Sequence, residues 1–380
     1  MKEKRRDIPF PETYNSLYKF GFKYLWEKGI LDEYDNNHFI IQALMNNPKI
    51  FDRVKRYCNV VTMYAEGRKA FPQNFCVNFE SRLQTMYNIF GQATIEDFIK
   101  GQLAAGKKHY NESQFFEALT EIEVLLFFAC FGPGLSKGIY EPKTGKGNHN
   151  PEATFEYATG DKISIEVKTP EFQQVLPHKD EIMPLYLLTD DGIKQFGKVC
   201  EQSGYVFKKP RVSKLKSFLE SACDKFSVPA EKEYNILCIN WTYTDIAYGG
   251  YIEPTMLLYN PINGVFNHRN MAKQLNINEE IYEKISAVFV FQNSVDSILF
   301  TDLRYLWAGY PRKAIMMLNP FLLNTEAKRA EFYEKIQIRP NDFRINFDIK
   351  MYYDTAHGIS PIAAGRLSKI IDEMHLKDLY

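Results

Sequence analysis

One stretch decides how this chain is interpreted: Asn150-Pro-Glu152-Ala-Thr-Phe-Glu-Tyr157-Ala-Thr-Gly160-Asp-Lys162-Ile-Ser-Ile-Glu166-Val-Lys168. Residues 153–157 and 162–168 are predicted to be strands, and the four residues between them have the composition of a hairpin turn. Side chains alternate faces along a strand, so Glu166 and Lys168 point the same way. A hairpin brings Glu152, at the start of the first strand, beside them.

Two carboxylates and one ammonium on one face of a sheet suit phosphodiester cleavage. Mg²⁺ binds one or two carboxylates, several waters and substrate phosphate oxygens. The metal lowers the pKa of a bound water, and a lysine orients that water and offsets the developing negative charge. The pattern therefore predicts a hydrolase that breaks phosphodiester bonds by in-line attack of a metal-activated water.

The (Asp/Glu)-x-Lys triplet occurs at three other places, and each fits less well. Glu141 precedes Pro142 in a loop, and Glu326/Lys328 lies in a charged, helix-like stretch. Asp348/Lys350 lies on a strand-like segment, but Asp348 comes only six positions after Asp342, which is too close for a hairpin. Context rather than the triplet itself favours Glu166/Lys168.

The surrounding pattern predicts an α/β sheet with helices on its faces. The expected helices are 113–130, 212–226 and 370–379, and the further expected strands are 234–241, 285–291 and 313–318. Two segments are expected to be loops, the Gly- and Lys-rich 132–150 and an insertion or lid over 171–210.

The length of 380 residues favours more than one packed unit. Residues 1–104 show helical periodicity, as in 14–25, and are expected to serve recognition, regulation or assembly. Residues 105–320 are expected to form the catalytic core, and 321–380 a C-terminal extension packed on it.

Composition excludes several classes of protein. The formal net charge is zero, so any nucleic-acid surface must be local. Residues 1–10 do not resemble a secretory signal, and the most apolar stretch, 124–131, is too short to span a membrane. Six cysteines without a CxxC pair fit a reducing cytoplasm and argue against a disulfide framework or structural zinc.

The motif resembles the PD-(D/E)xK nuclease superfamily over roughly residues 110 to 300. The resemblance implies a restriction-endonuclease-like core, a Mg²⁺ or Mn²⁺ cofactor and DNA as the substrate. It implies that Glu152, Glu166 and Lys168 are the catalytic residues and that the main-chain carbonyl of Val167 is a metal ligand. Glu152 stands where the pattern prefers Asp, which puts ligation there in doubt.

The family also has an acidic helix before the hairpin, and here the helix at 113–130 is apolar nearly all round. A glutamate on it is therefore expected to be buried, and a buried carboxylate needs a partner or a metal. The resemblance favours Glu121 as a further catalytic and metal-binding residue, with Glu123 as the alternative. His149 lies just before the motif, where a loop histidine without a catalytic role is the simpler interpretation.

A basic segment follows the motif. Its members are expected to contact nucleic-acid phosphates: Lys194, Lys198, Lys208, Lys209, Arg211, Lys214 and Lys216. The alternative is an ordinary solvated charged face.

The sequence thus predicts a DNA endonuclease, in restriction or phage defence, acting alone, as a homodimer or with a partner subunit. Two other functions stay open. One is an inactive nuclease fold that serves as a binding or assembly module, and the other is a nuclease specific for RNA or branched DNA.

Overall fold

The computed structural model describes residues 20–21, 23, 38–44, 71–103, 110–131, 134–143, 149–170, 179–183, 189–241, 252–259, 264–291 and 314–336. The chain divides into two compact units. Unit 1 comprises Met1–Phe131, Lys137–Tyr140 and Asn293–Leu306, and unit 2 comprises Gly132–Ser136, Glu141–Gln292 and Trp307–Tyr380.

Before position 132, the regular structure of the described residues in unit 1 is helical. Its elements are α3 (Phe39–Leu44), α6 (Phe71–Phe90), α7 (Gln92–Phe98), the π-helix η4 (Ile99–Leu103) and α8 (Glu112–Phe131). Aromatic rings fill the space between these helices, because Phe115 of α8 packs against both Phe39 and Phe79. This packing groups α8 with the N-terminal helices, whereas the change of sequence pattern predicts a boundary at 104/105.

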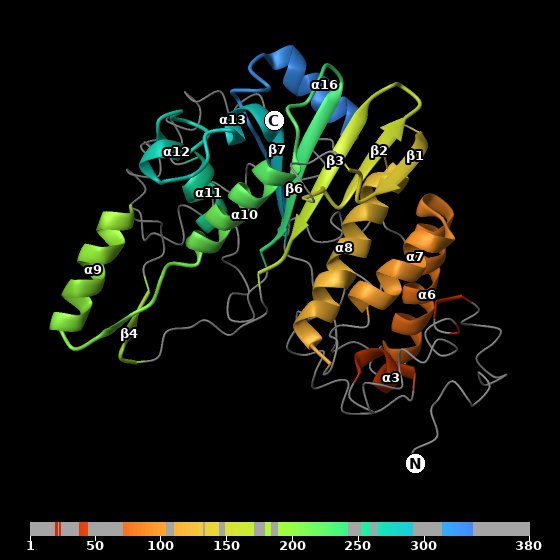
Figure 1. The fold of residues 1–380 in the computed structure, drawn as a ribbon, viewed down its shortest axis with the longest axis horizontal. Coiled ribbons are helices and arrows are strands. Elements are labelled where there is room, and N and C mark those ends of the chain that lie inside the picture. Colours follow the sequence, from red (N-terminus) through yellow and green to blue (C-terminus); the bar gives the residue numbers. More distant parts are fainter. Residues whose placement is uncertain are drawn as a thin grey trace, which may run out of the picture. The chain divides into compact units, whose positions relative to one another are not determined.

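A mixed six-stranded sheet has the order β1-β2-β3-β6-β7-β8 (Figure 1). The strands are β1 (Leu135–Tyr140), β2 (Ala153–Tyr157), β3 (Lys162–Lys168), β6 (Glu233–Asn240), β7 (Ala287–Phe291) and β8 (Ala314–Leu318). The β2–β3 and β7–β8 pairs are antiparallel, while β3, β6 and β7 run parallel. The α/β class that the sequence predicts is confirmed.

The hairpin strands have the predicted bounds, because short alternating patterns with a clear turn leave little freedom of register. Gly160 in the turn has a φ of 82°, a conformation that a residue without Cβ adopts at little cost. Two buried strands, β6 and β7, are apolar along most of their length, as expected for parallel strands covered on both faces.

Helices flank the six-stranded sheet in unit 2, and the described ones are α10 (Val212–Lys225), α11 (Ile252–Tyr259), α12 (Met271–Gln274), α13 (Ile281–Lys284) and α16 (Glu326–Ile336). A further helix, α9 (Asp190–Gln202), lies away from this sheet, and its Phe196 ring packs against Phe207 (Figure 1). On one face, Leu215 and Leu219 of α10 join Leu237 of β6 in one buried cluster, and α11 and α13 lie on the same side (Figure 1). On the other face, the Phe332 ring of α16 meets Tyr234. None of the helices in the described ranges is long and apolar enough to cross a bilayer.

Two expected loops contain regular structure. The segment 132–150 includes the strand β1, which lies at an edge of the sheet and is half-buried, so it lacks the alternation that would mark it. The segment 171–210 includes α9, capped by the Thr189 hydroxyl, and the short parallel pair β4 (Glu181–Ile182) and β5 (Val206–Phe207). These parts of the loop predictions are wrong.

Some predictions fall outside the described residues. They are the helix at 14–25 apart from residues 20, 21 and 23, the terminal helix at 370–379 and the Asp348/Lys350 triplet.

Candidate active site

The strand register places Glu166 and Lys168 on the face of the sheet that α10 covers. In the parallel β3–β6 pair, Glu166 lies beside Leu237 and Lys168 beside Ile239. Leu237 and Ile239 belong to the cluster that α10 covers, so Glu166 and Lys168 face the same side of the sheet. The predicted common orientation of the two side chains is therefore realised, and the Lys168 Nζ lies 2.6 Å from Glu166 Oε1.

The hairpin brings Glu152 to this pair. Ala153 is paired with Ile165 in the antiparallel ladder, and one further step of the same register sets Glu152 opposite Glu166. Both carboxylates thus lie at one end of the hairpin, as the turn between the strands predicts.

A lysine that the sequence does not single out joins the two acids. Lys225, the last residue of α10, places its Nζ 2.8 Å from Glu166 Oε1 and 3.1 Å from Glu152 Oε1. Lys214 and Lys216 earlier in the same helix look equally suitable in sequence, and only the packing of α10 across β3 brings Lys225 to the carboxylates. We name the four side chains Glu152, Glu166, Lys168 and Lys225 the carboxylate–lysine cluster.

Glu166 is the electrostatic centre of this cluster. Its side chain has no exposed surface, and burial raises its pKa to about 7, with the Glu152 charge acting in the same direction and Lys168 and Lys225 opposing. Burial lowers the pKa of Lys225, but the charges of Glu152 and Glu166 outweigh it and raise that pKa overall. The raised pKa of Glu166 favours its neutral form, whereas the raised pKa of Lys225 reflects a charged ammonium held by ionised carboxylates. We favour the ionised pair, because two ammonium groups lie within 2.8 Å of one oxygen.

A third acid borders the cluster. The Glu141 backbone N–H donates to the Glu152 carbonyl over 2.8 Å. The pKa of Glu141 is raised, first by burial and then by the Glu152 charge, while Lys225 lowers it. The position of Glu141 in a loop before a proline gives no sign of this contact in the sequence.

The donor set fits a hard divalent cation. Among the described residues, Glu166 Oε2 is buried and has no hydrogen-bond partner, so an oxygen of the preferred ligand type is left unsatisfied. The described residues contain no group of three or more His, Cys, Asp and Glu side chains that could hold a metal ion. Two carboxylates nevertheless suffice for Mg²⁺, which keeps several waters. Ligation by the Val167 carbonyl stays a prediction.

The two candidate helix acids differ in their partners within unit 1. Tyr140 Oη donates to Glu121 Oε1 over 2.8 Å. Glu123 is paired with Arg82, and both side chains are buried. Burial raises the pKa of Glu123 to about 7 despite the opposing effect of Arg82. Glu123 is therefore committed to a structural ion pair, and the assignment of Glu121 to the metal site stays a prediction.

The basic side chains of the segment 194–216 differ in burial and in their partners. Arg211 is buried and pairs with Glu253 over 3.0 Å, and Lys208 pairs with Glu181 over 2.7 Å. Lys214 lies over the ring of Phe218. Side chains facing solvent are Lys194, Lys198, Lys209 and Lys214, with Lys216 partly covered. The guanidinium of Arg211 therefore points to the interior and not to a ligand.

Comparison of the chain with protein-family models, with curated proteins and with solved structures gave no match. The case for a function therefore rests on the geometry of the carboxylate–lysine cluster.

Proposed function

We propose that this protein is a metal-dependent phosphodiesterase that cleaves DNA, built on a restriction-endonuclease-like core. The observation that carries the proposal is the convergence of Glu152, Glu166 and Lys168 at one end of the β2–β3 hairpin, with a buried Glu166 oxygen that has no partner among the described residues. Glu166 and Glu152 are the residues that would hold Mg²⁺ or Mn²⁺.

The bound cation would supply an acidified water and positive charge against the phosphate. Lys168, held as an ammonium against Glu166, orients the attacking water and offsets the negative charge that builds on the phosphate oxygens. The bond from water oxygen to phosphorus forms as the opposite ester bond breaks. The products are a phosphate monoester end and a hydroxyl end, and no covalent enzyme intermediate is needed.

Exposed lysines beyond the cluster would contact the substrate backbone. Lys194, Lys198 and Lys209 face solvent, so they are the members of the basic segment best suited to neutralise phosphates. Because contacts to phosphates carry no sequence information, we expect these lysines to add affinity rather than sequence preference.

The test is cleavage of plasmid DNA, single-stranded DNA, branched DNA and RNA with Mg²⁺, Mn²⁺ or EDTA. We expect metal-dependent cleavage of DNA, and Lys168→Ala lowers turnover about 10²–10⁴-fold. Lys273→Ala, at an exposed lysine of α12, is the matched control and keeps full activity. Binding without cleavage in any metal would favour an inactive module, preferential RNA or branched-DNA cleavage would change the substrate class, and full activity of Lys168→Ala would refute the assignment.

A further inference from the structure

Lys225 occupies an unusual position for a residue of a metal site. Its Nζ lies within 3.1 Å of an oxygen from each acid, which is the position that a cation shared by two carboxylates takes. This ammonium offsets the repulsion between Glu152 and Glu166. A divalent cation that binds both acids must compete with it, because like charges at such separations repel strongly in a partly buried site.

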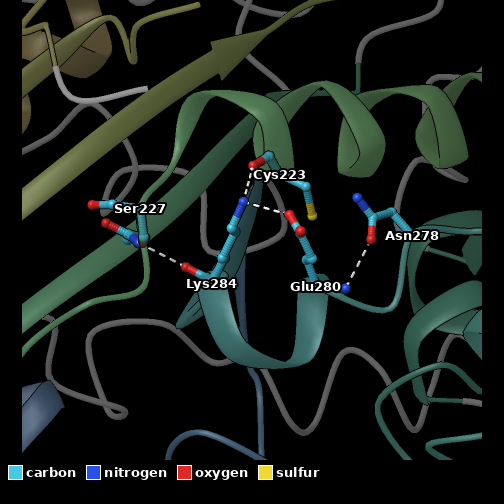
Figure 2. Close-up of polar contacts among 6 residues, drawn as sticks. Cys223, Ser227, Asn278, Glu280 and Lys284 are labelled. Carbon is cyan, nitrogen blue, oxygen red and sulfur yellow. Dashed lines mark hydrogen bonds and ion pairs between the residues drawn. The ribbon is translucent and has the colours of Figure 1, made fainter. Parts of the chain in front are cut away.

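The chain is held by hydrogen bonds on either side of Lys225, at Cys223 and at Ser227, both of which are labelled in Figure 2. Lys284 Nζ donates to the Cys223 carbonyl over 2.8 Å, two residues before Lys225. On the other side, Asn235 Nδ2 donates to the carbonyls of Ser227 and Lys284, each over 2.7 Å. The end of α10 is thus held to α13 and β6 by hydrogen bonds, so we expect the Lys225 ammonium to move by rotation of its side chain rather than by a shift of the helix.

The side chain has room to move. Lys225 keeps 18% of its side-chain surface exposed, whereas Glu166 has none. Four methylene groups allow a lysine head to reach solvent while its stem stays packed. Glu166, by contrast, is fixed on a central part of the sheet and offers its second oxygen, which has no hydrogen-bond partner among the described residues.

We propose that the Lys225 ammonium is an internal counter-ion that bridges Glu152 and Glu166 when the divalent cation is absent and withdraws from them when the cation binds. The inference rests on the proposed function, since it assumes that the two acids bind a metal. It makes Lys225 a positioning residue that tunes metal affinity.

Metal titration of the purified full-length protein tests whether Lys225 weakens the binding of a divalent cation. Mn²⁺ binding is measured by calorimetry for wild type, Lys225→Met, Lys225→Arg and the control Lys273→Met. We expect Lys225→Met to bind Mn²⁺ at least about tenfold more tightly, because a unit charge at the site is removed. Lys225→Arg and Lys273→Met stay close to wild type. Lys225→Gln replaces Lys225→Met if the latter does not fold.

Chemical labelling provides a second test that needs no variant. Acetylation of individual lysines is followed by mass spectrometry, with Lys273 as the exposed reference. Addition of Mg²⁺ should increase the labelling rate of Lys225 relative to Lys273, because the ammonium leaves its two carboxylates.

The outcomes separate this inference from the proposed function. If Lys225→Met binds Mn²⁺ equally or more weakly while Glu166→Gln abolishes binding, Lys225 is not a competing ion and the metal site stands. Labelling of Lys225 that is unchanged or slowed by Mg²⁺ would likewise overturn the role of Lys225 alone. If neither wild type nor the Lys225 variants bind Mn²⁺, the inference and the proposed function both fail.

Discussion

Two buried glutamates in this protein have similarly raised pKa values but different neighbouring side chains. Glu123 in unit 1 and Glu166 in unit 2 are both sealed from solvent, and burial raises the pKa of each to about 7. Glu123 faces Arg82, whose side chain is only 5% exposed, inside a helical core. Glu166 faces Lys168 and Lys225, with side chains 22% and 18% exposed.

The difference shows that a perturbed pKa alone does not identify a functional site. Buried ion pairs within a core shift pKa values as strongly as active sites do. What distinguishes Glu166 is the second acid beside it and its lysine partners that reach solvent, since both glutamates have buried oxygens without a hydrogen-bond partner among the described residues. Glu123 therefore has the surroundings of a structural ion pair, and a functional role for Glu166 remains our proposal.

The largest expected effect on stability comes from breaking the buried Arg82–Glu123 ion pair of unit 1. Arg82→Met strands the Glu123 carboxylate in the interior, and we expect the free energy of unfolding to fall by about 3–5 kcal/mol, measured by urea denaturation at alkaline pH. The double variant Arg82→Met/Glu123→Met removes both charges and recovers most of the loss. A single-variant change below about 1 kcal/mol would show that the pair is not structural.

The pH dependence of stability tests the raised pKa of Glu123. Because the folded-state pKa of Glu123 is raised above its ordinary value of 4.5 to about 7, its stabilising contribution is complete below 4.5 and is lost as pH rises through 7. We therefore expect wild type to lose stability relative to Glu123→Gln across that window. Chemical denaturation at several pH values measures the difference, and a constant difference would contradict the shift.

The anchor at the end of α10 is expected to have a smaller effect. Asn235→Ala removes two hydrogen bonds to backbone carbonyls, and the predicted loss is about 2 kcal/mol in the free energy of unfolding. Asn278→Ala is a matched control, because Asn278 is exposed and its side chain accepts from the Glu280 N–H (Figure 2). Equal losses in the two variants would mean that the anchor does not hold the helix end.

The smallest effect is expected at the exposed lysines. Lys209→Ala leaves stability unchanged, lowers DNA affinity modestly and reduces the slope of log affinity against log salt by about 0.9. Lys273→Ala leaves that slope unchanged. Filter binding at several salt concentrations measures both, and an unaltered slope in Lys209→Ala would exclude Lys209 from the interface.

Local sequence pattern was enough to predict the hairpin. The alternation in 153–157 and 162–168 and the turn between them fix the strand pairing and hence the meeting of Glu152 with Glu166. The edge strand β1 was missed because it is half-buried and lacks the alternation that marks a strand. The helix α9 does carry a helical pattern, since Ile193, Phe196 and Cys200 recur at helical spacing, so it could have been predicted from the sequence.

Long-range packing explains what was missed at the site. Lys225 reaches the acids only because α10 packs across β3 and β6, and its own sequence resembles that of other helix lysines. In the same way, a count of basic residues does not reveal that Arg211 turns inward to Glu253. Residue type and spacing predict local geometry, whereas partners distant in sequence depend on the packed fold.

The role of Glu166 in metal-dependent cleavage is tested most directly by comparing two isosteric changes under single-turnover conditions. Glu166→Gln and Glu123→Gln are assayed for Mg²⁺- and Mn²⁺-dependent cleavage of plasmid DNA, with folded fractions matched by circular dichroism. We predict that Glu166→Gln loses cleavage by about 10³-fold or more, whereas Glu123→Gln stays close to wild type. Retention of metal-dependent cleavage by Glu166→Gln would contradict the proposed site.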